Sequence, residues 1–434
     1  MDLLHQAREI INEVDSQMAQ LFQRRMEASE MAARYKLEKG MPILDAQREA
    51  LVIRNGAARV ADEGLRGYYV DFMRETMAIS RRYQQRLLER MKDQDEGCTV
   101  LDRDGSHPII IRRGALAKAH KYMDLQRKAL IVTDSGVPQA YAQAVAACCQ
   151  SPLVVTIDQG ESSKNMENFQ LLCKKMLQAG FTSTDCVVAV GGGVVGDLAG
   201  FAAASFMRGI DFYNIPTTVL SQVDSSIGGK VAIDMDGIKN CVGAFHQPKA
   251  VLVDPEVLST LPPRQIANGL AEVVKMAATF DESLLSLFET EDPLAHIDDI
   301  IIQSLKIKAF VVQADEREVG LRRVLNFGHT IGHGIESAVG LDRLCHGECV
   351  ALGMLPMCSP ALRSRLETIL KKLDLPTTCD ADPETVWEAI AHDKKLSGSH
   401  ITVIYAPEAG SFELRTMPLE ALKETVFEFL GAKE

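Results

Sequence analysis

The stretch "VVAVGGGVVGDLAGFAAASFM", residues 187–207, contains one ionisable side chain, Asp197. A membrane span needs about twenty apolar residues without a turn. Here glycines stand at 191, 192, 193 and 196, and the residues after them are mostly small. The stretch therefore predicts a buried strand, a glycine turn and a helix, which is the unit from which parallel α/β sheets are built.

The glycines at 191, 193 and 196 also satisfy the pattern G-x-G-x-x-G between a strand and a helix. At such a turn, backbone N–H groups and the helix dipole can hold a pyrophosphate. A tight packing turn between strand and helix produces the same string, so both interpretations stay open at this point.

The composition is that of a soluble globular protein with two or three domains: 434 residues, 46% hydrophobic and 24% charged. The first fifteen residues include acidic side chains and no continuous apolar segment, which predicts a cytoplasmic protein rather than a secreted one. The ten cysteines form no C-x-x-C pair, which argues against a disulfide framework or a thiolate zinc site.

The net charge of -12 disfavours nucleic acid and anionic membranes as partners. The charge is uneven, because residues 1–92 hold 16 Lys and Arg against 14 Asp and Glu, which leaves 31 against 45 in the rest. Clusters of Lys and Arg in the acidic segment, residues 93–434, therefore require a specific explanation such as a binding site for an anion.

Apolar residues recur every three or four positions from Leu3 to Met91, which predicts three helices at 3–39, 43–61 and 66–92. The first would be about 55 Å long, too long to bury its apolar stripe against two short partners, so we expect a dimeric helical bundle. Further on, short β-rich runs at 109–111, 129–133, 153–157 and 186–190 alternate with helical stretches, and helices dominate after about 255. The predicted order is a helical domain (1–92), a linker (93–107), an α/β nucleotide-binding domain (108–254) and an α-helical metal- and substrate-binding domain (255–434).

Three histidines and a glutamate suggest a metal centre in the last domain. His329 and His333 are four residues apart and so share one helix face, His346 follows shortly after, and Glu272 lies upstream. Nitrogen and oxygen ligands of this kind suit a catalytic divalent ion. A bare H-x-x-x-H pair is also common among solvent-facing histidines, so the spacing alone does not decide.

Four cations stand beside glycine turns or beside these ligands: Lys230, Lys239, Lys308 and Arg322. Gathered near a metal in an acidic domain, they predict a site for a small anion such as phosphate. The alternative is that each is a surface cation in a local ion pair.

The segments "GGGVVGDLAGFAAASFMRGIDFYNIPTTVLSQVDSSIGGKVAI" (191–233), "GLAEVVK" (269–275), "ADEREVGLRRVLNFGHTIGHGIES" (314–337) and "HGECVALGM" (346–354) resemble the 3-dehydroquinate synthases. The resemblance covers roughly residues 107–434. It implies conversion of the seven-carbon keto-acid phosphate DAHP into 3-dehydroquinate and phosphate, the second step of the shikimate pathway, with NAD and a divalent ion, zinc or cobalt.

The resemblance also implies roles for single residues. Glu272, His329 and His346 would bind the metal, with His333 as a nearby acid or base. The positions that match the catalytic and substrate-binding set are Lys230, Lys275, Lys308, Glu318, Arg322, Asn326, Asp224, Lys239 and Asn240. The positions that match the NAD-binding set are Asp134, Glu161, Lys164, Gly192, Gly193, Val194, Asp197, Thr217 and Thr218.

Four further positions are Arg208, Lys394, Lys395 and Asp211. Arg208 matches an arginine that reaches the phosphate bound by the neighbouring subunit, and the resemblance does not choose between Lys394 and Lys395 as a further substrate contact. Asp211 stands about twenty residues after the glycines, where a Rossmann fingerprint has its ribose-binding acid. The family instead assigns that contact to the segment "VTDSG" (132–136), and we follow the family.

In the implied reaction, NAD oxidises a secondary alcohol and the new ketone acidifies the neighbouring C–H bond. Phosphate then leaves by β-elimination, the hydride returns, and an aldol step closes the ring. The metal acts as a Lewis acid, while lysines and an arginine bind the phosphate and the carboxylate.

The segments "AREIINEVDSQMAQLFQRRMEASEMAARYKLEKGMPILDAQRE" (7–49) and "AISRRYQQ" (78–85) resemble the all-helical chorismate mutases over residues 3–92. The resemblance implies rearrangement of chorismate, a dianion, to prephenate. Cations must then hold two carboxylates, and a donor must lie near the ether oxygen. The positions that match the family's substrate-binding set are Arg8, Arg25, Lys36, Asp45, Arg48, Glu49, Ser80 and Gln84.

The sequence thus predicts a bifunctional enzyme that acts on small-molecule substrates and combines the two families in one chain. We expect this chain to form a homodimer. Two alternatives stay open. The helical domain could be an inactive dimerisation or regulatory module, and the large domain could be another sugar-phosphate cyclase or a metal-dependent alcohol dehydrogenase.

Overall fold

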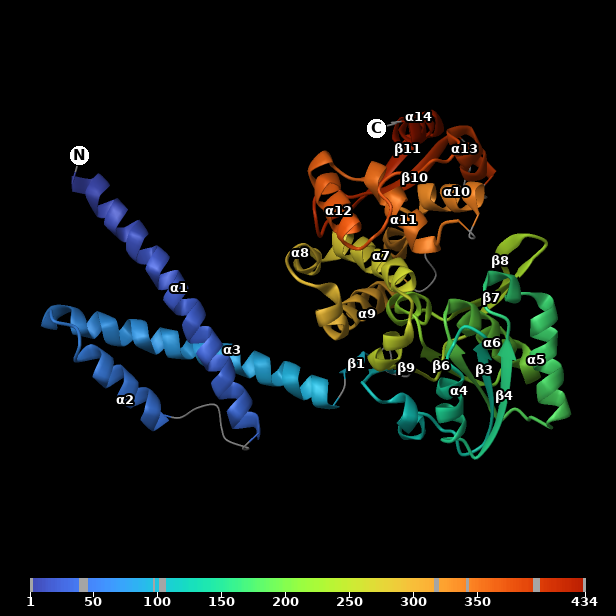
Figure 1. Ribbon diagram of the computed structural model, residues 1–434, viewed down its shortest axis with the longest axis horizontal. Coiled ribbons are helices and arrows are strands. Elements are labelled where there is room, and N and C mark those ends of the chain that lie inside the picture. The colour runs from blue at the N-terminus through green and yellow to red at the C-terminus, as the bar shows by residue number, and fades with distance from the viewer. Residues whose placement is uncertain are drawn as a thin grey trace. The chain divides into compact units, whose positions relative to one another are not determined.

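The structure is a computed structural model that describes residues 3–38, 46–96, 98–100, 107–315, 320–340, 343–392 and 399–431. The chain divides into two compact units, Met1–Gly97 and Cys98–Glu434 (Figure 1). Each unit is described by itself below.

The first unit contains three α-helices at the expected places: α1 (Leu3–Glu38), α2 (Ala46–Ala57) and α3 (Arg66–Glu96). Helix α3 packs against both α1 and α2. The N-terminal half of α1 extends past α3, with no other described helix of this unit beside it (Figure 1). The segment expected to be a linker, 93–107, contains the end of α3 and strand β1 (Cys98–Val100), and its residues 101–106 lie outside the described part of the chain.

The second unit is built on a seven-stranded sheet in the order β1-β2-β9-β6-β5-β3-β4, parallel except for the β1–β2 pair. Its strands after β1 are β2 (Ile109–Ile111), β3 (Lys128–Asp134), β4 (Ser151–Ile157), β5 (Cys186–Gly191), β6 (Asp211–Pro216) and β9 (Ala250–Val253). The chain passes from β3 to β4 on one side and returns to place β5 on the other side of β3. This reversal creates the crevice in which open α/β sheets bind their ligands, outside the carboxyl ends of β3 and β5.

Side chains alternate between the two faces of the sheet along each buried strand, and each face packs against different helices. Leu130 and Val132 of β3 pack with α5 (Met166–Gln178) and α6 (Gly193–Ser205). Ala129 and Ile131 face the other way, toward α4 (Gln139–Ala146). Because both faces are covered, the strands are nearly continuous runs of apolar residues, as the sequence of 187–190 indicates.

The rest of the second unit is mostly helical, apart from two hairpins. Its helices are α7 (Pro263–Phe280), α8 (Glu282–Thr290), α9 (Ile297–Ala314), α10 (His329–Val339), α11 (His346–Met354), α12 (Pro360–Lys372), α13 (Pro383–His392) and α14 (Leu419–Gly431). The hairpins are β7 (Lys230–Met235) with β8 (Ile238–Phe245), and β10 (His400–Tyr405) with β11 (Glu413–Pro418). One large apolar core joins these helices to β2 and β9 of the sheet. Among the described helices, none is both long and apolar enough to cross a membrane.

Glycines allow three of these helices to approach closely. A Cβ atom added to Gly347 of α11 would lie 2.0 Å from the carbonyl oxygen of Asn268 on α7. One added to Gly353 of α11 would lie 2.0 Å from the carbonyl oxygen of Gly328, which precedes α10. The contact between the three backbones therefore requires glycine at both positions, and it places side chains of α7, α10 and α11 around a common point.

Candidate functional site

Glycines 191–193 lie at the carboxyl end of β5, beside the point where the strand order reverses. Gly192 is the N-cap of α6 and provides no side-chain hydrogen bond to the helix start. Thr217 donates its backbone N–H to the carbonyl of Gly191 at 2.9 Å, and a Cβ on Gly192 would lie 3.3 Å from the Thr218 methyl carbon. The uncapped N–H groups of α6 fit a pyrophosphate. The packing interpretation of the string also has support, because a Cβ on Gly196 would lie 3.2 Å from Asn214.

A buried lysine gathers carboxylates next to this turn. Lys164 forms ion pairs with Glu161, with Asp197 of α6 at 3.5 Å, and with Asp234 of β7 at 3.8 Å. Burial raises the pKa of Asp197 to about 7, although Lys164 opposes the shift. Glu161, Lys164 and Asp197 were all expected at the NAD site. Asp234 was not, because no local pattern indicates which carboxylate a distant hairpin will bring to Lys164.

Asp134 is the last residue of β3, so it lies at the same edge of the sheet as the glycine turn. Its carboxylate accepts the backbone N–H of Gly136 at 2.8 Å, and burial raises its pKa. Val194, the second residue of α6, is partly buried.

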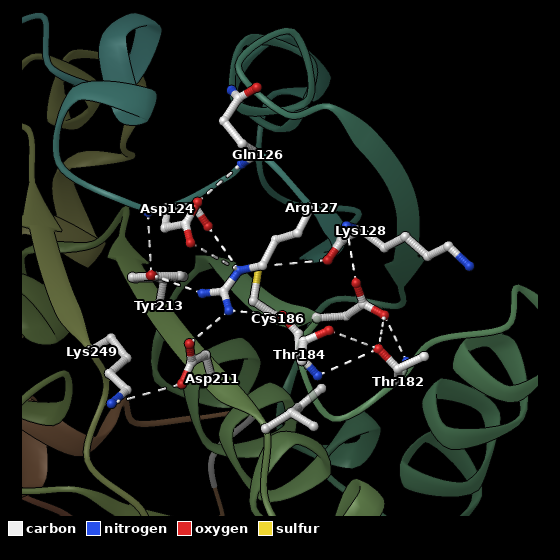
Figure 2. A network of polar contacts seen from close by, with 12 residues as sticks. Asp124, Gln126, Arg127, Lys128, Thr182, Thr184, Cys186, Asp211, Tyr213 and Lys249 are labelled. Atoms are coloured by element: carbon white, nitrogen blue, oxygen red, sulfur yellow. Dashed lines mark hydrogen bonds and ion pairs between the residues drawn. The ribbon is translucent and has the colours of Figure 1, made fainter.

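Asp211 lies at the opposite, amino-terminal end of the parallel strands. It begins β6, where it pairs with Arg127 at 2.7 Å and with Lys249 at 3.8 Å. Arg127 also donates to the hydroxyl of Tyr213 at 3.0 Å (Figure 2). The carboxylate of Asp211 therefore belongs to a structural network at the amino ends of the strands.

The four residues expected at the metal centre come together from three helices. Nε2 of His329 and Nε2 of His346 lie 3.5 and 3.4 Å from Oε1 of Glu272, whose side chain is 1% exposed. The ligand atoms of His329, His333 and His346 all lie within 4.8 Å of one another. Neither Glu272 oxygen accepts a well-formed hydrogen bond within the described part of the chain, although Oε2 is ion-paired with Lys275.

The hydrogen bonds at the back of the two histidine rings fit a metal site. Nδ1 of His329 donates to the carbonyl of Phe327 at 3.1 Å, and Nδ1 of His346 donates to Oε2 of Glu336 at 2.8 Å. In its neutral form each ring therefore carries its lone pair on Nε2, which faces Glu272. This is the arrangement in which outer hydrogen bonds fix the tautomer of metal-binding histidines.

The electrostatics of the two rings differ. Burial lowers the pKa of His329 to about 3. The pKa of His346 is raised to about 10, because the carboxylates of Glu272 and Glu336 outweigh burial. A metal ion at this site would replace the proton on Nε2 of His346.

Two of the cations expected at the site, Lys308 and Lys239, are paired with buried or half-buried acids. Lys308 of α9 donates to Oδ1 of Asp224 at 2.6 Å, and burial lowers the lysine's pKa. Asp224 lies on a π-helical turn, Ser221–Ser225, a backbone form common at functional sites. Lys239 of β8 is ion-paired with Glu336.

Four more of the expected residues lie on the hairpin β7–β8 and on the turn before α10. Arg322 covers Gly228, because a Cβ there would lie 2.3 Å from its Nη2 atom. Lys230 begins β7 and is exposed, and Asn326 is half-buried at the end of the turn Leu321–Asn326. Asn240 has a left-handed backbone (φ 54°) and donates its N–H to Asp234 at 2.8 Å.

The structure does not bring Arg208 to this site. It is exposed, and it follows α6 at the amino end of β6, so about 20 Å of helix separates it from the glycine turn. Met207 and Arg208 both have positive φ, 50° and 67°. Glu318, Asp45, Lys394 and Lys395 lie outside the described residues.

A second pocket, of about 130 Å³, lies in the first unit. Six of the eight expected substrate-binding residues line it: Arg25, Lys36, Arg48, Glu49, Ser80 and Gln84. Arg25 donates to Ser80 and to the sulfur of Met77, and burial lowers its pKa. Oε1 of the buried Gln84 has no hydrogen-bond partner in the described chain.

Two residues depart from the expected set. Arg8 does not line the pocket and is exposed on the N-terminal half of α1. Arg81, which is not among the expected residues, lines the pocket and is ion-paired with Glu49. The sequence signal that could have identified Arg81 is its position directly after Ser80, which is one of the expected residues.

Three family models match the chain. Residues 154–268 match the 3-dehydroquinate synthase N-terminal model, 269–396 match the 3-dehydroquinate synthase C-terminal model, and 7–85 match chorismate mutase type II. The 3-dehydroquinate synthase of Enterococcus faecalis (strain ATCC 47077 / OG1RF) is 41% identical over 339 residues, or 73% of this chain and 95% of the relative.

Two solved structures share the fold of the second unit. A 2-deoxy-scyllo-inosose synthase, complexed with carbaglucose-6-phosphate, NAD+ and Co2+, is 25% identical with a TM-score of 0.69, over 77% of this chain and all of the other. The 2-epi-5-epi-valiolone synthase of Streptomyces hygroscopicus subsp. jinggangensis 5008, with NAD+ and Zn2+ bound, is 27% identical with a TM-score of 0.67. That match covers 74% of this chain and 97% of the other.

Proposed function

The chain belongs to the 3-dehydroquinate synthase family and carries a chorismate mutase domain before it, and from this premise we propose which residues perform the two reactions. It is a bifunctional shikimate-pathway enzyme that converts DAHP into 3-dehydroquinate and phosphate, and chorismate into prephenate. The observation that carries the first assignment is the convergence of Glu272, His329 and His346 beside paired cations.

We propose that Glu272, His329 and His346 hold a divalent ion, zinc or cobalt. NAD would lie along the glycine turn, with its pyrophosphate at the start of α6 and its ribose near Asp134. When bound, NAD takes up and returns a hydride while the ion polarises a substrate oxygen. The solved relatives that contain NAD+ with Co2+ or Zn2+ support both cofactors.

The cations around the centre would bind and orient the acidic substrate. Lys308 and Lys239 are ion-paired with Asp224 and Glu336. Lys275, which is 2% exposed, lies one helical turn after Glu272. Together with Lys230 and Arg322, these side chains would supply positive charge for a phosphate and a carboxylate, and the contacts of the buried Lys275 and Lys308 would be stronger than in water.

His333 is the residue proposed to move protons. Its ring centroid lies 5.2 Å from that of His329 and 5.8 Å from that of His346. It is therefore close enough to the metal ligands to exchange a proton with a bound substrate directly or through one water.

In the first unit, Arg25, Lys36 and Arg48 would hold the two carboxylates of chorismate, and Gln84 would donate to the ether oxygen. No covalent catalyst is needed for a pericyclic rearrangement, so a pocket that orients and polarises the dianion is sufficient. Four cations, these three and Arg81, line the pocket, and their convergence favours an active mutase over an inactive module.

We further propose that the chain is a cytoplasmic homodimer. Helix α1 exposes apolar side chains along its N-terminal half, including Leu3 (82% exposed) and Ile10 (63%). A second copy packed there would bury them and bring its Arg8 to the mutase pocket. Arg208 is held outward by a strained backbone and would likewise serve the partner's phosphate site.

The synthase assignment is tested by measuring phosphate release from DAHP with and without NAD and a chelator. We expect release only when NAD and a divalent ion are both present, with no net NADH. NADH accumulation without phosphate would indicate an alcohol dehydrogenase. Release from a sugar phosphate but not from DAHP would indicate another cyclase of the same fold.

A further inference from the structure

Glu336 joins two parts of the second unit through its two carboxylate oxygens. It lies on α10, seven residues after His329 and three after His333, and its side chain is 10% exposed. Oε2 accepts the Nδ1–H of His346 on α11 at 2.8 Å, and Oε1 is ion-paired with Lys239 on β8. One buried carboxylate therefore connects a metal ligand to the hairpin that carries Lys239 and Asn240.

The backbone and the ring of His346 are held by different groups. The helix start is fixed by Asn268, whose Oδ1 accepts the N–H of Gly347 at 2.6 Å, and by Glu348, which accepts the N–H of Cys345 at 2.8 Å. Neither contact restrains rotation of the imidazole. The hydrogen bond to Glu336 does, and it keeps Nε2 directed at Glu272.

The two histidines of the centre differ in this respect. The ring of His329 is held by a neutral backbone carbonyl, that of Phe327. The ring of His346 is held by a carboxylate, which makes the opposite nitrogen a stronger donor to a cation and is a common outer partner of metal-binding histidines. Removing this carboxylate should therefore weaken a metal at the site even though Glu336 itself faces away from it.

We propose that Glu336 is a positioning residue that acts through His346 on the metal centre, an inference that rests on the metal site proposed above. The geometry gives Lys239 an indirect role, because it contacts Glu336 and not the histidine. Its ammonium is 44% exposed and satisfies the second oxygen of Glu336, but it does not touch His346. The effect on the metal should therefore follow the carboxylate and not the lysine.

The test uses the full-length protein freed of metal and titrated with Co2+ against a chromophoric chelator, with the visible spectrum of the bound ion recorded. We expect E336Q to bind Co2+ about 10- to 100-fold more weakly than the wild type, with displaced absorption bands. K239M should keep the wild-type affinity and spectrum. E367Q, which removes a carboxylate from a surface pair with Arg363, is the matched control for a Glu-to-Gln change.

Each outcome has one meaning. Unchanged affinity and spectrum in folded E336Q would overturn the proposal, as would an equal weakening in K239M. If circular dichroism shows that E336Q does not fold, E336D replaces it, because its shorter side chain keeps the charge but withdraws the oxygen from Nδ1, and the same weakening is expected. A wild-type protein that binds no Co2+ would instead refute the proposed metal centre.

Discussion

Nε2 of His346 lies 3.4 Å from Oε1 of Glu272, although the two residues belong to different helices and are joined by no well-formed hydrogen bond. A fully buried carboxylate is costly unless a charge or a hydrogen bond satisfies it. Here Lys275 neutralises one oxygen, and the other faces two imidazole nitrogens. A divalent ion bound between this oxygen and the two imidazoles would satisfy the carboxylate in the same way.

The pair formed by Lys308 and Asp224 should contribute to stability as well as to substrate binding. In K308M the carboxylate of Asp224 loses its counter-charge, and because Asp224 keeps some exposure we expect a loss of about 2 kcal/mol in unfolding free energy, below the range for fully buried pairs. Urea denaturation measures the change. The double variant D224N/K308M should recover most of it, and a double variant no more stable than K308M would contradict the explanation.

The pKa of Asp197 predicts a pH dependence of stability in the cofactor-free protein. Its pKa is raised from 3.8 to about 7 in the folded state, so between these values the unfolded chain releases a proton that the folded chain keeps. Stability relative to D197N should therefore fall as the pH rises from about 4 to about 7 and level off above it. Thermal unfolding of both proteins across this range is the measurement, and parallel curves would refute the shift.

The position of Arg322 should depend on the absence of a side chain at residue 228. The residue has φ of 100°, and a Cβ there would lie 2.3 Å from the guanidinium, so G228A must strain the turn and displace Arg322. We expect kcat/KM for DAHP to fall roughly 10- to 100-fold, since small misplacements at a site cost this much. Prephenate formation by the same chain should not change.

Gly340 provides the control for this substitution. It also has positive φ, 85°, but among the described residues, its chain neighbours aside, no atom lies within 4 Å of a Cβ added there. G340A therefore tests backbone strain without displacement of an arginine. Equal losses of synthase activity in G228A and G340A would show that strain, and not Arg322, is responsible.

The elements predicted from sequence are those with a strong local signal. The strand, turn and helix at 187–205 follow from an apolar run broken by glycines, and His329 and His333 share a face because of helical spacing. Glu336 lies on that same face, seven residues after His329, and the spacing could have revealed it. The spacing alone did not identify Glu336, because a glutamate one turn after two histidines is usually an ordinary surface charge of a helix. Its role is visible only once the tertiary structure places His346 beside it.

Other contacts required the tertiary structure. Asp234 reaches Lys164 only because the hairpin β7–β8 folds over α6, and no pattern in "KVAIDM" indicates that. Arg81 was passed over for the opposite reason: residues 81 and 82 are both arginines, and only the packing of α3 on α2 turns the first toward Glu49. Periodicity predicts which face of an element is buried, but not which partner lies there.

The mutase pocket should depend on Arg8 supplied by a second chain. R8A and R25A should each abolish prephenate formation. In R8A the pocket lacks the arginine that the other chain supplies, and in R25A it lacks the arginine of its own chain. Mixed and re-associated, the two variants should regain roughly a quarter of wild-type activity, since half of the dimers then contain one intact pocket. No recovery from the mixture would contradict the exchange of Arg8 between chains.

The central claim is that a divalent ion binds where α7, α10 and α11 meet, beside the glycine turn that holds NAD. The most direct measurement is anomalous diffraction at the cobalt edge from crystals of the full-length protein grown with NAD and Co2+. We expect one strong peak within bonding distance of Glu272 Oε1, His329 Nε2 and His346 Nε2, with NAD density along the start of α6. Cobalt bound elsewhere while these three side chains stay unliganded would contradict the account.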